Sequence, residues 1–340
     1  MSRRPPLFIH VGLRKAASTT LQKGLFAKLP QINHFGMWLN DTTRFADPQV
    51  SDLIHRIILS DGVNYDRAAA RALADQAVLS KLDPAKINTL SDEKLGGFWR
   101  GYADRRLIAE RLKDVFGDIR IILMVREQVD HFLANYIALG GEYKLAPDRL
   151  RVRLPVTDHL EYMMRYPDYE QLGHLKAGRL AGMYADIVGR ENVCVLLFEE
   201  MRDDLPAFAR RIGGFLGVDA AAVVACLLGR HENPRRQTQL MLAYRSLRSH
   251  LFPGTSLSAL LPKSVQTGFE RMLARGAKSH IALPAEWIER LRVYYAEDNA
   301  QLARSFGLDL ARWGYALPGV ARTATSIQPQ ASGVLIQEEG

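Results

Sequence analysis

One segment near the N-terminus, LFIHVGLRKAASTTLQKGLF at residues 7–26, constrains the fold of this chain more than any other. A short apolar run ends at Gly12, and Leu21, Leu25 and Leu29 then recur every four residues, the spacing of one helix face. The turn between them holds two basic residues and three hydroxyls. α/β proteins hold phosphates on such strand–turn–helix units, because backbone N–H groups and the helix dipole face the anion. The segment therefore predicts a nucleotide-binding turn.

The turn does not have the spacing of the phosphate-binding loop of nucleoside triphosphatases, G-x-x-x-x-G-K-[ST]. Two residues separate Gly12 from Lys15, and no glycine directly precedes the lysine. Ala16 and Ala17 separate the lysine from Ser18, whereas the triphosphatase pattern has Ser or Thr directly after the lysine. A nucleotide kinase or NTPase with a degenerate loop of this type therefore stays only as an alternative.

The turn resembles instead the 5′-phosphosulfate-binding loop of sulfotransferases that use 3′-phosphoadenosine 5′-phosphosulfate (PAPS). That loop reads as an apolar strand followed by G-x-x-K-[ST]-[GA]-[ST]-[ST]-[ST]-L. Ala16 departs from the pattern, because the family often has Ser or Thr there. The matching residues are Gly12, Lys15, Ala17, Ser18, Thr19, Thr20 and Leu21.

A second motif lies at residues 118–136, DIRIILMVREQVDHFLANY. The run from Ile121 to Val125 predicts a strand that is buried on both faces, as in a parallel sheet. Arg126 follows at its C-terminal end, where open α/β sheets bind their ligands. A bidentate, charge-assisted contact with a phosphate is typical of such an arginine. The alternative is an ion pair with an acidic neighbour such as Asp130.

This second motif resembles the 3′-phosphate motif of the same sulfotransferases, R-x-P-x-x-R-x-x-S-x-Y. Arg126 and Tyr136 match it. Gln128 stands in place of the proline, His131 in place of the second arginine, and Ala134 in place of the phosphate-binding serine. The missing hydroxyl at Ala134 leaves open how tightly PAPS is held.

Later segments extend the resemblance to roughly residues 7–316. Residues 192–218 resemble a late strand, an acidic turn and a helix that ends in F-L-G. Residues 294–315 resemble a C-terminal signature of bacterial members, Y-x-x-D-N-x-x-L followed by W-G-Y. The resemblance implies a PAPS-dependent sulfotransferase that acts on a hydroxyl or amine, with a carbohydrate or glycan as the expected acceptor. A non-catalytic nucleotide- or glycan-binding protein is a further alternative.

The resemblance also implies roles for particular residues. Lys15 would stabilise charge on the leaving phosphate, and Glu93, after a predicted strand, is the first candidate for the catalytic base. A structural role for Asp92 and Glu93, as a cap of the segment that follows, explains these residues about equally well. His34 is the second candidate for the base. The expected PAPS-binding residues are Arg14, Lys15, Ala16, Ala17, Ser18, Thr19, Thr20, Arg126, Ala134, Tyr136, Arg235 and Arg236.

Composition narrows the class of partner. The 340-residue chain has a net charge of +8 and 47% hydrophobic residues, which indicates a globular protein with anionic ligands. Its Lys/Arg runs are short and lack interleaved aromatics, so we expect an anionic nucleotide donor rather than nucleic acid. The scattered histidines and two cysteines predict neither a metal site nor a disulfide framework. No apolar stretch is long enough for a membrane span, and we expect a cytoplasmic, bacterial enzyme.

The order of predicted elements is typical of an α/β fold, with a central parallel sheet flanked by helices on both faces, P-loop-like architecture and a helical C-terminal part. We expect one domain at 1–318, a lid or acceptor-binding insertion at 230–283, and a disordered tail at 319–340. Residues 140–157 read as a long loop over the active-site edge. Strands are predicted at about 7–11, 31–35, 87–90, 119–125 and 192–198. Helices are predicted at about 18–29, 47–60, 66–81, 104–116, 128–139, 159–165, 168–188, 204–216, 219–228, 237–250 and 284–306.

Overall fold

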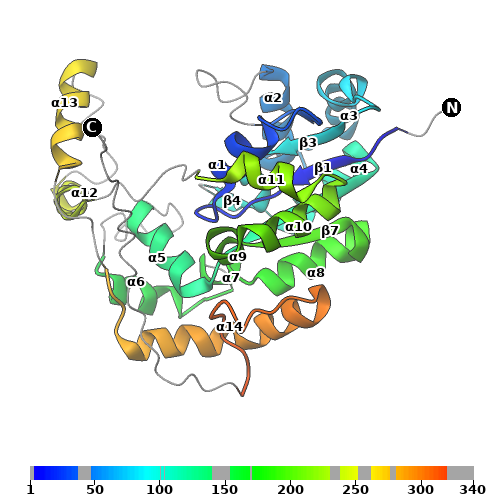
Figure 1. Ribbon diagram of the computed structural model, residues 1–340. Helices are drawn as coiled ribbons and strands as arrows, with labels where there is room; N and C mark the ends of the chain where they lie inside the picture. Colours follow the sequence, from blue (N-terminus) through cyan, green and yellow to red (C-terminus); the bar gives the residue numbers. More distant parts are fainter. Residues whose placement is uncertain are drawn as a thin grey trace, which may run out of the picture.

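A five-stranded, fully parallel β-sheet lies at the centre of the molecule (Figure 1). This computed structural model describes residues 4–36, 47–99, 101–102, 104–139, 154–168, 171–229, 238–251, 262–275 and 281–319. The strands follow one another across the sheet in the order β2-β3-β1-β6-β7. Their bounds are β1 (Leu7–His10), β2 (Ile32–His34), β3 (Ile87–Ser91), β6 (Ile119–Val125) and β7 (Val193–Leu197). The predicted parallel sheet and all five predicted strands are confirmed.

The central strands are apolar because helices cover both faces of the sheet. The side chains of β7 are buried throughout, and those of β6 are buried except for one. On one face lie α4 (Arg105–Phe116) and α8 (Ala177–Val188), which contact each other. On the other face lie η1 (Leu21–Phe26), α11 (Ala220–Leu227) and α10 (Leu205–Leu216). The predicted helical layers on both faces are confirmed.

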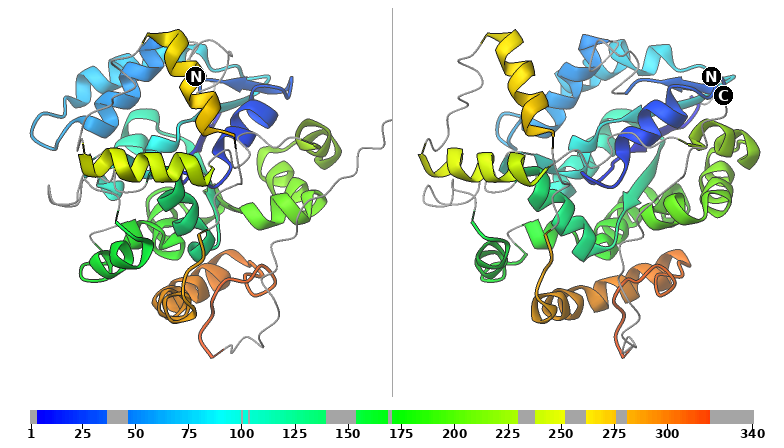
Figure 2. Two further views of the ribbon diagram at one scale, coloured as in Figure 1. Left: turned by 90° about the vertical axis from the view of Figure 1, so that its left-hand side faces the viewer. Right: turned by 60° about the vertical axis from the view of Figure 1, so that its left-hand side comes forward.

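The other helices extend these layers. Helix α14 (Ala285–Phe306) packs along α8 and also contacts α5 (Gln128–Leu139). The helices α12 and α13 form the outermost part of one side, on the left in Figure 1 and at the front in the left-hand view of Figure 2. The bounds of the rest are α1 (Ser18–Thr20), α2 (Pro48–Leu59), α3 (Arg67–Ala77), η2 (Leu79–Lys81), η3 (Glu93–Gly96), α6 (Val156–Met163), α7 (Gln171–His174), η6 (Arg190–Asn192), α9 (Phe198–Asp203), α12 (Gln239–Leu251) and α13 (Lys263–Leu273).

Several elements differ from the sequence prediction. The helix expected at 168–188 is two helices, α7 and α8, and the first predicted helix continues from α1 into the π-helical η1. Helix α9 occupies the segment where an acidic turn was expected. Two of its buried positions are the acidic residues Glu199 and Glu200, so the sequence has no apolar periodicity that predicts a helix there. The hairpin of β4 (Phe98–Trp99) and β5 (Gly101–Tyr102) has strands too short to show alternation.

Two apolar clusters stabilise the fold. The larger one surrounds the sheet, and the smaller one joins α5, α6, α7 and α14 around Phe132, Leu160 and Trp287. Among the described residues, no helix is both long enough and apolar enough to cross a bilayer. The loop expected at 140–157 lies largely outside the described residues, as does the tail beyond residue 319.

Candidate anion-binding site

The loop between β1 and α1 has an uncommon backbone conformation. Lys15 and Ala17 have φ angles of 63° and 62°, in the left-handed region that residues other than glycine rarely adopt. A Cβ atom added to Gly12 would lie 2.3 Å from Ser18 Oγ and 2.8 Å from two ring atoms of His10. When a tight turn contains left-handed residues, successive backbone N–H groups point toward one side. This arrangement creates a concavity that can bind an anion. The loop backbone therefore has left-handed residues of the kind that occur in anion-binding turns.

Two side chains from the second motif hold this loop by its carbonyl groups. Arg126 Nη1 donates a hydrogen bond to the carbonyl oxygen of Lys15, with a separation of 3.3 Å. His131 Nε2 donates to the carbonyl oxygen of Arg14. Burial lowers the pKa of His131 to about 3, so the ring is neutral at pH 7 and its one N–H is the donor. The two sequence motifs, on the adjacent strands β1 and β6, are therefore joined by hydrogen bonds.

Cationic side chains gather around Lys15. Its side chain is exposed, yet its pKa lies below the ordinary value because the surrounding loop displaces water and because Arg14, Arg245 and Arg126 are nearby. Glu93 acts in the opposite direction, and its Oε1 lies 4.0 Å from Arg14 Nε. Arg245 was not expected here, because it lies on α12, a helix that the motifs do not include. An excess of positive charge therefore surrounds the loop.

Glu93 begins the short helix η3 directly after β3. The cap of this helix is Asp92, whose carboxylate accepts a hydrogen bond of 2.9 Å from the N–H of Lys94. Glu93 itself is mostly buried beside Arg14, with 23% of its side chain exposed. The capping role considered in the sequence analysis thus belongs to Asp92, while Glu93 lies next to the loop.

His34 occupies a different environment, at the end of β2, two strands away from β1 in the sheet. Its Nδ1 lies 2.8 Å from Thr89 Oγ1, and its ring lies 5.5 Å from that of Phe26. The side chain is buried. His34 is therefore a buried side chain packed against Thr89 and Phe26.

A buried polar chain beneath the loop was missed by the sequence analysis. His10 Nδ1 lies 2.8 Å from Ser91 Oγ, and Gln22 Nε2 donates to the same oxygen at 2.9 Å. Burial lowers the pKa of His10 to about 3, so it is neutral at pH 7. The sequence signal that could have predicted this chain is the position of His10 and Ser91, each a polar residue at the end of an apolar strand. The chain links β1, β3 and η1 directly under the turn.

Arg126 forms the ion pair that the sequence analysis gave as the alternative to a phosphate contact. Its Nη2 lies 3.6 Å from a carboxylate oxygen of Asp130, and its guanidinium lies 4.6 Å from the centre of the Phe198 ring. With 15% of the side chain exposed, Arg126 is fixed against the protein and still reaches solvent. A fixed guanidinium beside the loop is well suited to a planar, two-point contact with an anion.

Gln128, Ala134 and Tyr136 of the second motif all lie on α5. Gln128 is buried, and its Nε2 donates to Asn299 Oδ1 at 2.5 Å, which ties α5 to α14. Tyr136 is also buried, and its hydroxyl donates to the carbonyl of Leu154 at 2.5 Å. Ala134 lies two residues before Tyr136 on the same helix and is half-buried. The structure therefore places Tyr136 in the smaller apolar cluster.

The hydroxyl residues of the loop differ in exposure. Ser18 and Thr20 are buried, Thr19 is half-buried, and Ser18 Oγ lies 3.4 Å from the carbonyl oxygen of Leu13. Ala16 is fully buried and Ala17 is half-buried. Arg235 and Arg236 lie outside the described residues.

A carboxylate pair lies beneath Arg126. Glu199 Oε1 accepts a hydrogen bond of 3.0 Å from the backbone N–H of Glu127, and Glu199 Oε2 accepts one of 3.0 Å from the Tyr315 hydroxyl. Burial raises the pKa of both carboxyl groups, and that of Glu127 reaches about 7. The nearby carboxyl groups of Asp130 and Glu199 also raise the pKa of Glu127. The tyrosine of the W-G-Y signature thus contributes to packing behind Arg126.

This pair makes stability depend on pH. Folded Glu127 keeps its proton up to about pH 7, whereas its ordinary pKa is 4.5, so the folded state binds more protons between these values and becomes less stable as pH rises through them. We expect Glu127→Gln to be more stable than the unmodified protein at pH 8, by about 1–3 kcal/mol, and nearly equal to it at pH 4.5. Urea unfolding at both pH values measures this. Glu161→Gln, at an exposed carboxyl, is the control. A Glu127→Gln protein that is no more stable at pH 8 contradicts the prediction.

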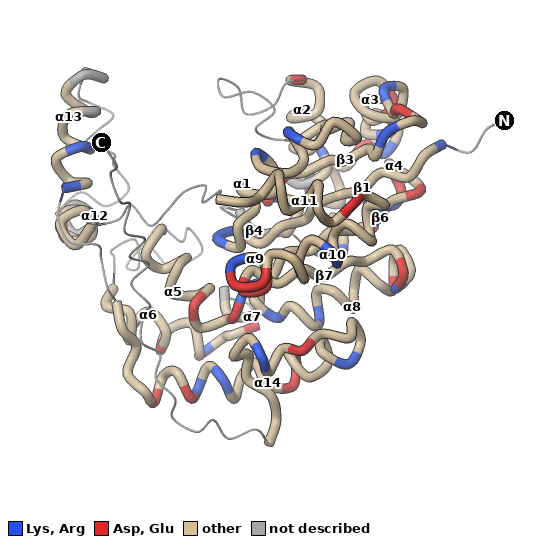
Figure 3. Tube along the Cα trace, viewed as in Figure 1, with Lys and Arg blue, Asp and Glu red and all other residues tan. Residues whose placement is uncertain are grey.

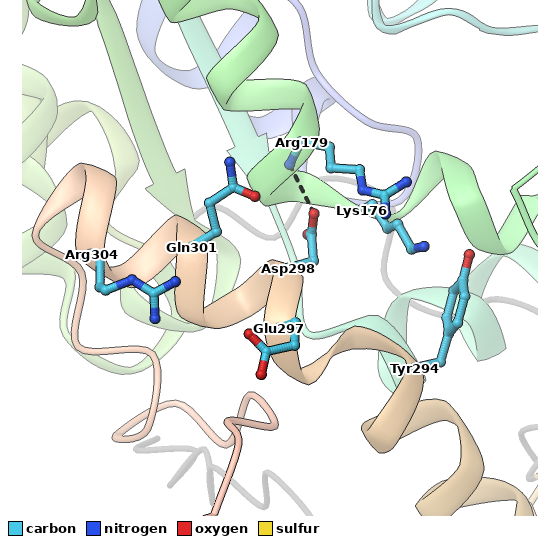
Figure 4. Close-up of a pocket in the computed structure, with 7 residues that line it drawn as sticks. All are labelled: Lys176, Arg179, Tyr294, Glu297, Asp298, Gln301 and Arg304. Atoms are coloured by element: carbon cyan, nitrogen blue, oxygen red, sulfur yellow. Dashed lines mark hydrogen bonds between the residues drawn. The ribbon is translucent and has the colours of Figure 1, made fainter.

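A hollow of about 240 Å³ between α8 and α14 lies apart from this loop (Figure 4). Asp298 points from α14 to the start of α8, where its two carboxylate oxygens accept the N–H groups of Gly178 and Arg179, each at 2.8 Å. The neighbouring Tyr295 donates to the carbonyl of Leu172 at 2.9 Å. The Y-x-x-D-N signature thus fastens α14 to the rest of the fold. The residues that line the hollow are Lys176, Arg179, Tyr294, Glu297, Asp298, Gln301 and Arg304.

Comparisons with known proteins identify similar structures. No protein-family model and no curated protein matches the sequence. A sulfotransferase from Alicyclobacillus acidocaldarius is 17% identical, with a TM-score of 0.49 over 92% of this chain and 99% of that chain. The sulfotransferase domain of the olefin synthase from Synechococcus PCC 7002 is 13% identical, with a TM-score of 0.41 over 91% and 99%. A sulfotransferase from Mycobacterium avium is 14% identical, with a TM-score of 0.41 over 82% and 79%.

Proposed function

We propose that this protein transfers the sulfuryl group of PAPS to a hydroxyl or amine acceptor, with a carbohydrate or glycan as the expected acceptor class. The observation that carries the proposal is the direct connection between the two anion-binding motifs. Arg126 and His131 donate to the carbonyl groups of Lys15 and Arg14. A nucleotide with phosphate groups at both its 5′ and 3′ positions requires two cationic sites that are held at a constant separation, and this connection supplies that constraint.

The charge around the loop suits such a polyanion. Arg14, Arg245 and Arg126 lower the pKa of Lys15, whereas Glu93 is the acidic group that counteracts them. A bound phosphosulfate would offset the repulsion among these cations and raise the pKa of Lys15 again. Binding of the donor is therefore expected to be coupled to the uptake of a proton wherever Lys15 is partly neutral.

The proposed reaction breaks the bond between sulfur and the bridging phosphate oxygen and forms a bond between sulfur and the acceptor atom. Lys15 would stabilise the negative charge that develops on the leaving phosphate, which is released as adenosine 3′,5′-bisphosphate. The acceptor proton would pass to Glu93, our first candidate for the base. We favour Glu93 over His34 because Glu93 lies beside Arg14, whereas His34 is buried against Thr89. The loop backbone and Arg126 would hold the donor in line with the acceptor.

A thermal-shift titration distinguishes this function from that of a nucleotide kinase. We expect adenosine 3′,5′-bisphosphate to raise the unfolding temperature, with about 2.7 kcal/mol of stabilisation at a concentration 100 times its Kd. ATP with or without Mg²⁺ should have a much smaller effect, because it has no 3′-phosphate. Stabilisation by Mg²⁺-ATP together with no response to the bisphosphate contradicts the proposal. Turnover of radiolabelled PAPS with a panel of glycans then separates an enzyme from a binding protein.

A further inference from the structure

Helix α12 exposes an apolar face. Its exposed side chains include Leu240, Ala243, Leu247 and Leu251, whose spacings of three, four and four residues place them on one side of the helix. The three leucines are 48%, 60% and 60% exposed. Arg245 turns the other way, and its Nη1 donates to the carbonyl of Ala138 on α5 at 3.0 Å. The exposed face of a helix normally presents polar residues to water, so this leucine face of α12 departs from the usual pattern.

Helix α13 packs beside α12 and continues this surface. The rings of Tyr244 and Phe269 meet edge to face at 5.0 Å, and the Thr238 hydroxyl donates to the carbonyl of Leu273. On α13, Val265 and Met272 are about half exposed, and exposed arginines lie nearby in the sequence of the helix. Five of the nine large apolar side chains that are exposed in the described part of the chain lie on these two helices. The exposed apolar residues are therefore concentrated here.

The same region is strongly basic. The described residues 238–251 and 262–275 contain five Lys or Arg and one Glu, and Lys/Arg positions on α13 are visible in Figure 3. In the sequence, residues 230–283 contain nine Lys or Arg against two Asp or Glu, a net charge of +7 where the whole chain has +8. Residues 230–283 of the sequence therefore account for most of the net positive charge of the protein, and Arg271 and Arg275 are exposed in the described part of this segment.

The helices also stand where a flat surface can reach them. Figure 1 and the right-hand view of Figure 2 show α12 and α13 at one edge of the molecule, away from the sheet. Among the described side chains of α12, Leu242 alone packs against the smaller apolar cluster, as a partly buried neighbour. The leucine face is thus open to the surroundings.

We propose that α12 and α13 dock this protein on an anionic membrane surface. Leucine side chains on a helix that lies along a bilayer enter the boundary between headgroups and acyl chains, while Lys and Arg side chains attract lipid phosphates. This occupant explains both the apolar face and the positive charge. A second copy of the chain would bring two regions of the same positive sign together, which disfavours self-association through this face. The proposal concerns a surface outside the loop site and does not depend on sulfuryl transfer.

Vesicle flotation tests the proposal with the full chain. We expect binding to vesicles that contain phosphatidylglycerol, little binding to phosphatidylcholine alone, and release as NaCl rises from about 0.05 to 0.5 M. The double variant Leu247→Asp/Leu251→Asp should lower the bound fraction by about tenfold or more, and Arg271→Glu should act in the same direction. Leu228→Asp is the matched control, because Leu228 is a 69% exposed leucine at the end of α11.

Circular dichroism and the unfolding temperature check that each variant is folded. Equal binding of the double variant and the unmodified protein overturns the proposal, as does an equal loss for Leu228→Asp. Light scattering tests whether a second copy of the chain, rather than a membrane, binds this face. If the unmodified protein is a dimer that the double variant disrupts while vesicle binding is unchanged, the face is an interface between copies and the membrane proposal is wrong.

Discussion

Replacing Lys15 with alanine is expected to lower sulfuryl transfer by about 100- to 1,000-fold, the usual cost of removing one preorganised donor that stabilises developing charge. The exposed Lys15 side chain stands among cations and beside Glu93, so its ammonium is the group best placed to meet charge on a leaving phosphate. Its removal should hardly change stability, because the side chain is not part of the core. PAPS turnover under saturating donor, together with the unfolding temperature, measures both effects.

The matched control for this variant is Lys28→Ala, which removes an exposed lysine just after η1. It should leave turnover unchanged. A Lys15→Ala protein with near-normal turnover would contradict the role proposed for Lys15. If its turnover falls only through a higher KM for PAPS, with kcat unchanged, then Lys15 binds the donor equally in the ground and transition states and does not stabilise the leaving group.

Exchange of Arg126 for lysine is expected to weaken the binding of adenosine 3′,5′-bisphosphate by about 10- to 100-fold, although the charge is kept. Arg126 uses one nitrogen to hold the Lys15 carbonyl and has further N–H groups in the same plane. Lysine offers a single ammonium, which cannot hold the loop and contact a phosphate from two fixed points. Isothermal titration calorimetry with the bisphosphate measures the loss.

The chain offers a close control for this exchange. Arg202 stacks on the same Phe198 ring, at 5.8 Å, and forms an ion pair with Asp203 at the surface. Arg202→Lys should therefore leave the affinity for the bisphosphate unchanged. Equal affinities for Arg126→Lys and the unmodified protein would show that Arg126 serves only to hold the loop or to pair with Asp130.

The sheet was predictable because its signal is local. Runs such as Ile121 to Val125 are apolar throughout, and only a strand covered on both faces buries every side chain of such a run. Gly12 and the hydroxyl residues after it similarly indicated the turn. Helices with a regular apolar face, such as α10 and α4, were found within a residue or two. These features depend on neighbours in the sequence, and so the sequence carries them.

Other features depend on contacts between distant residues. The carboxyl groups of Glu127 and Glu199 look like ordinary surface residues in the sequence. The fold supplies their donors: the Tyr315 hydroxyl and the Glu127 N–H donate to Glu199, and the Asp130 N–H donates to Glu127. Gln128 departs from the motif, but its bond to Asn299 shows that it joins two helices 171 residues apart in sequence. The apolar face of α12 was likewise invisible, because a leucine pattern does not say which side faces water.

The sequence by itself determined that this chain forms a parallel α/β sheet with a basic turn after its first strand and an arginine at the end of a later one. It also predicted which residues form that turn, because the spacing of Gly12, Lys15 and the hydroxyl residues is a local pattern. Only the tertiary structure decided that β1 and β6 are neighbours and that Arg126 and His131 hold the loop through its carbonyl groups. The physical reason is that elements form from local periodicity, whereas a hydrogen bond across 111 residues exists only when packing brings its two ends together.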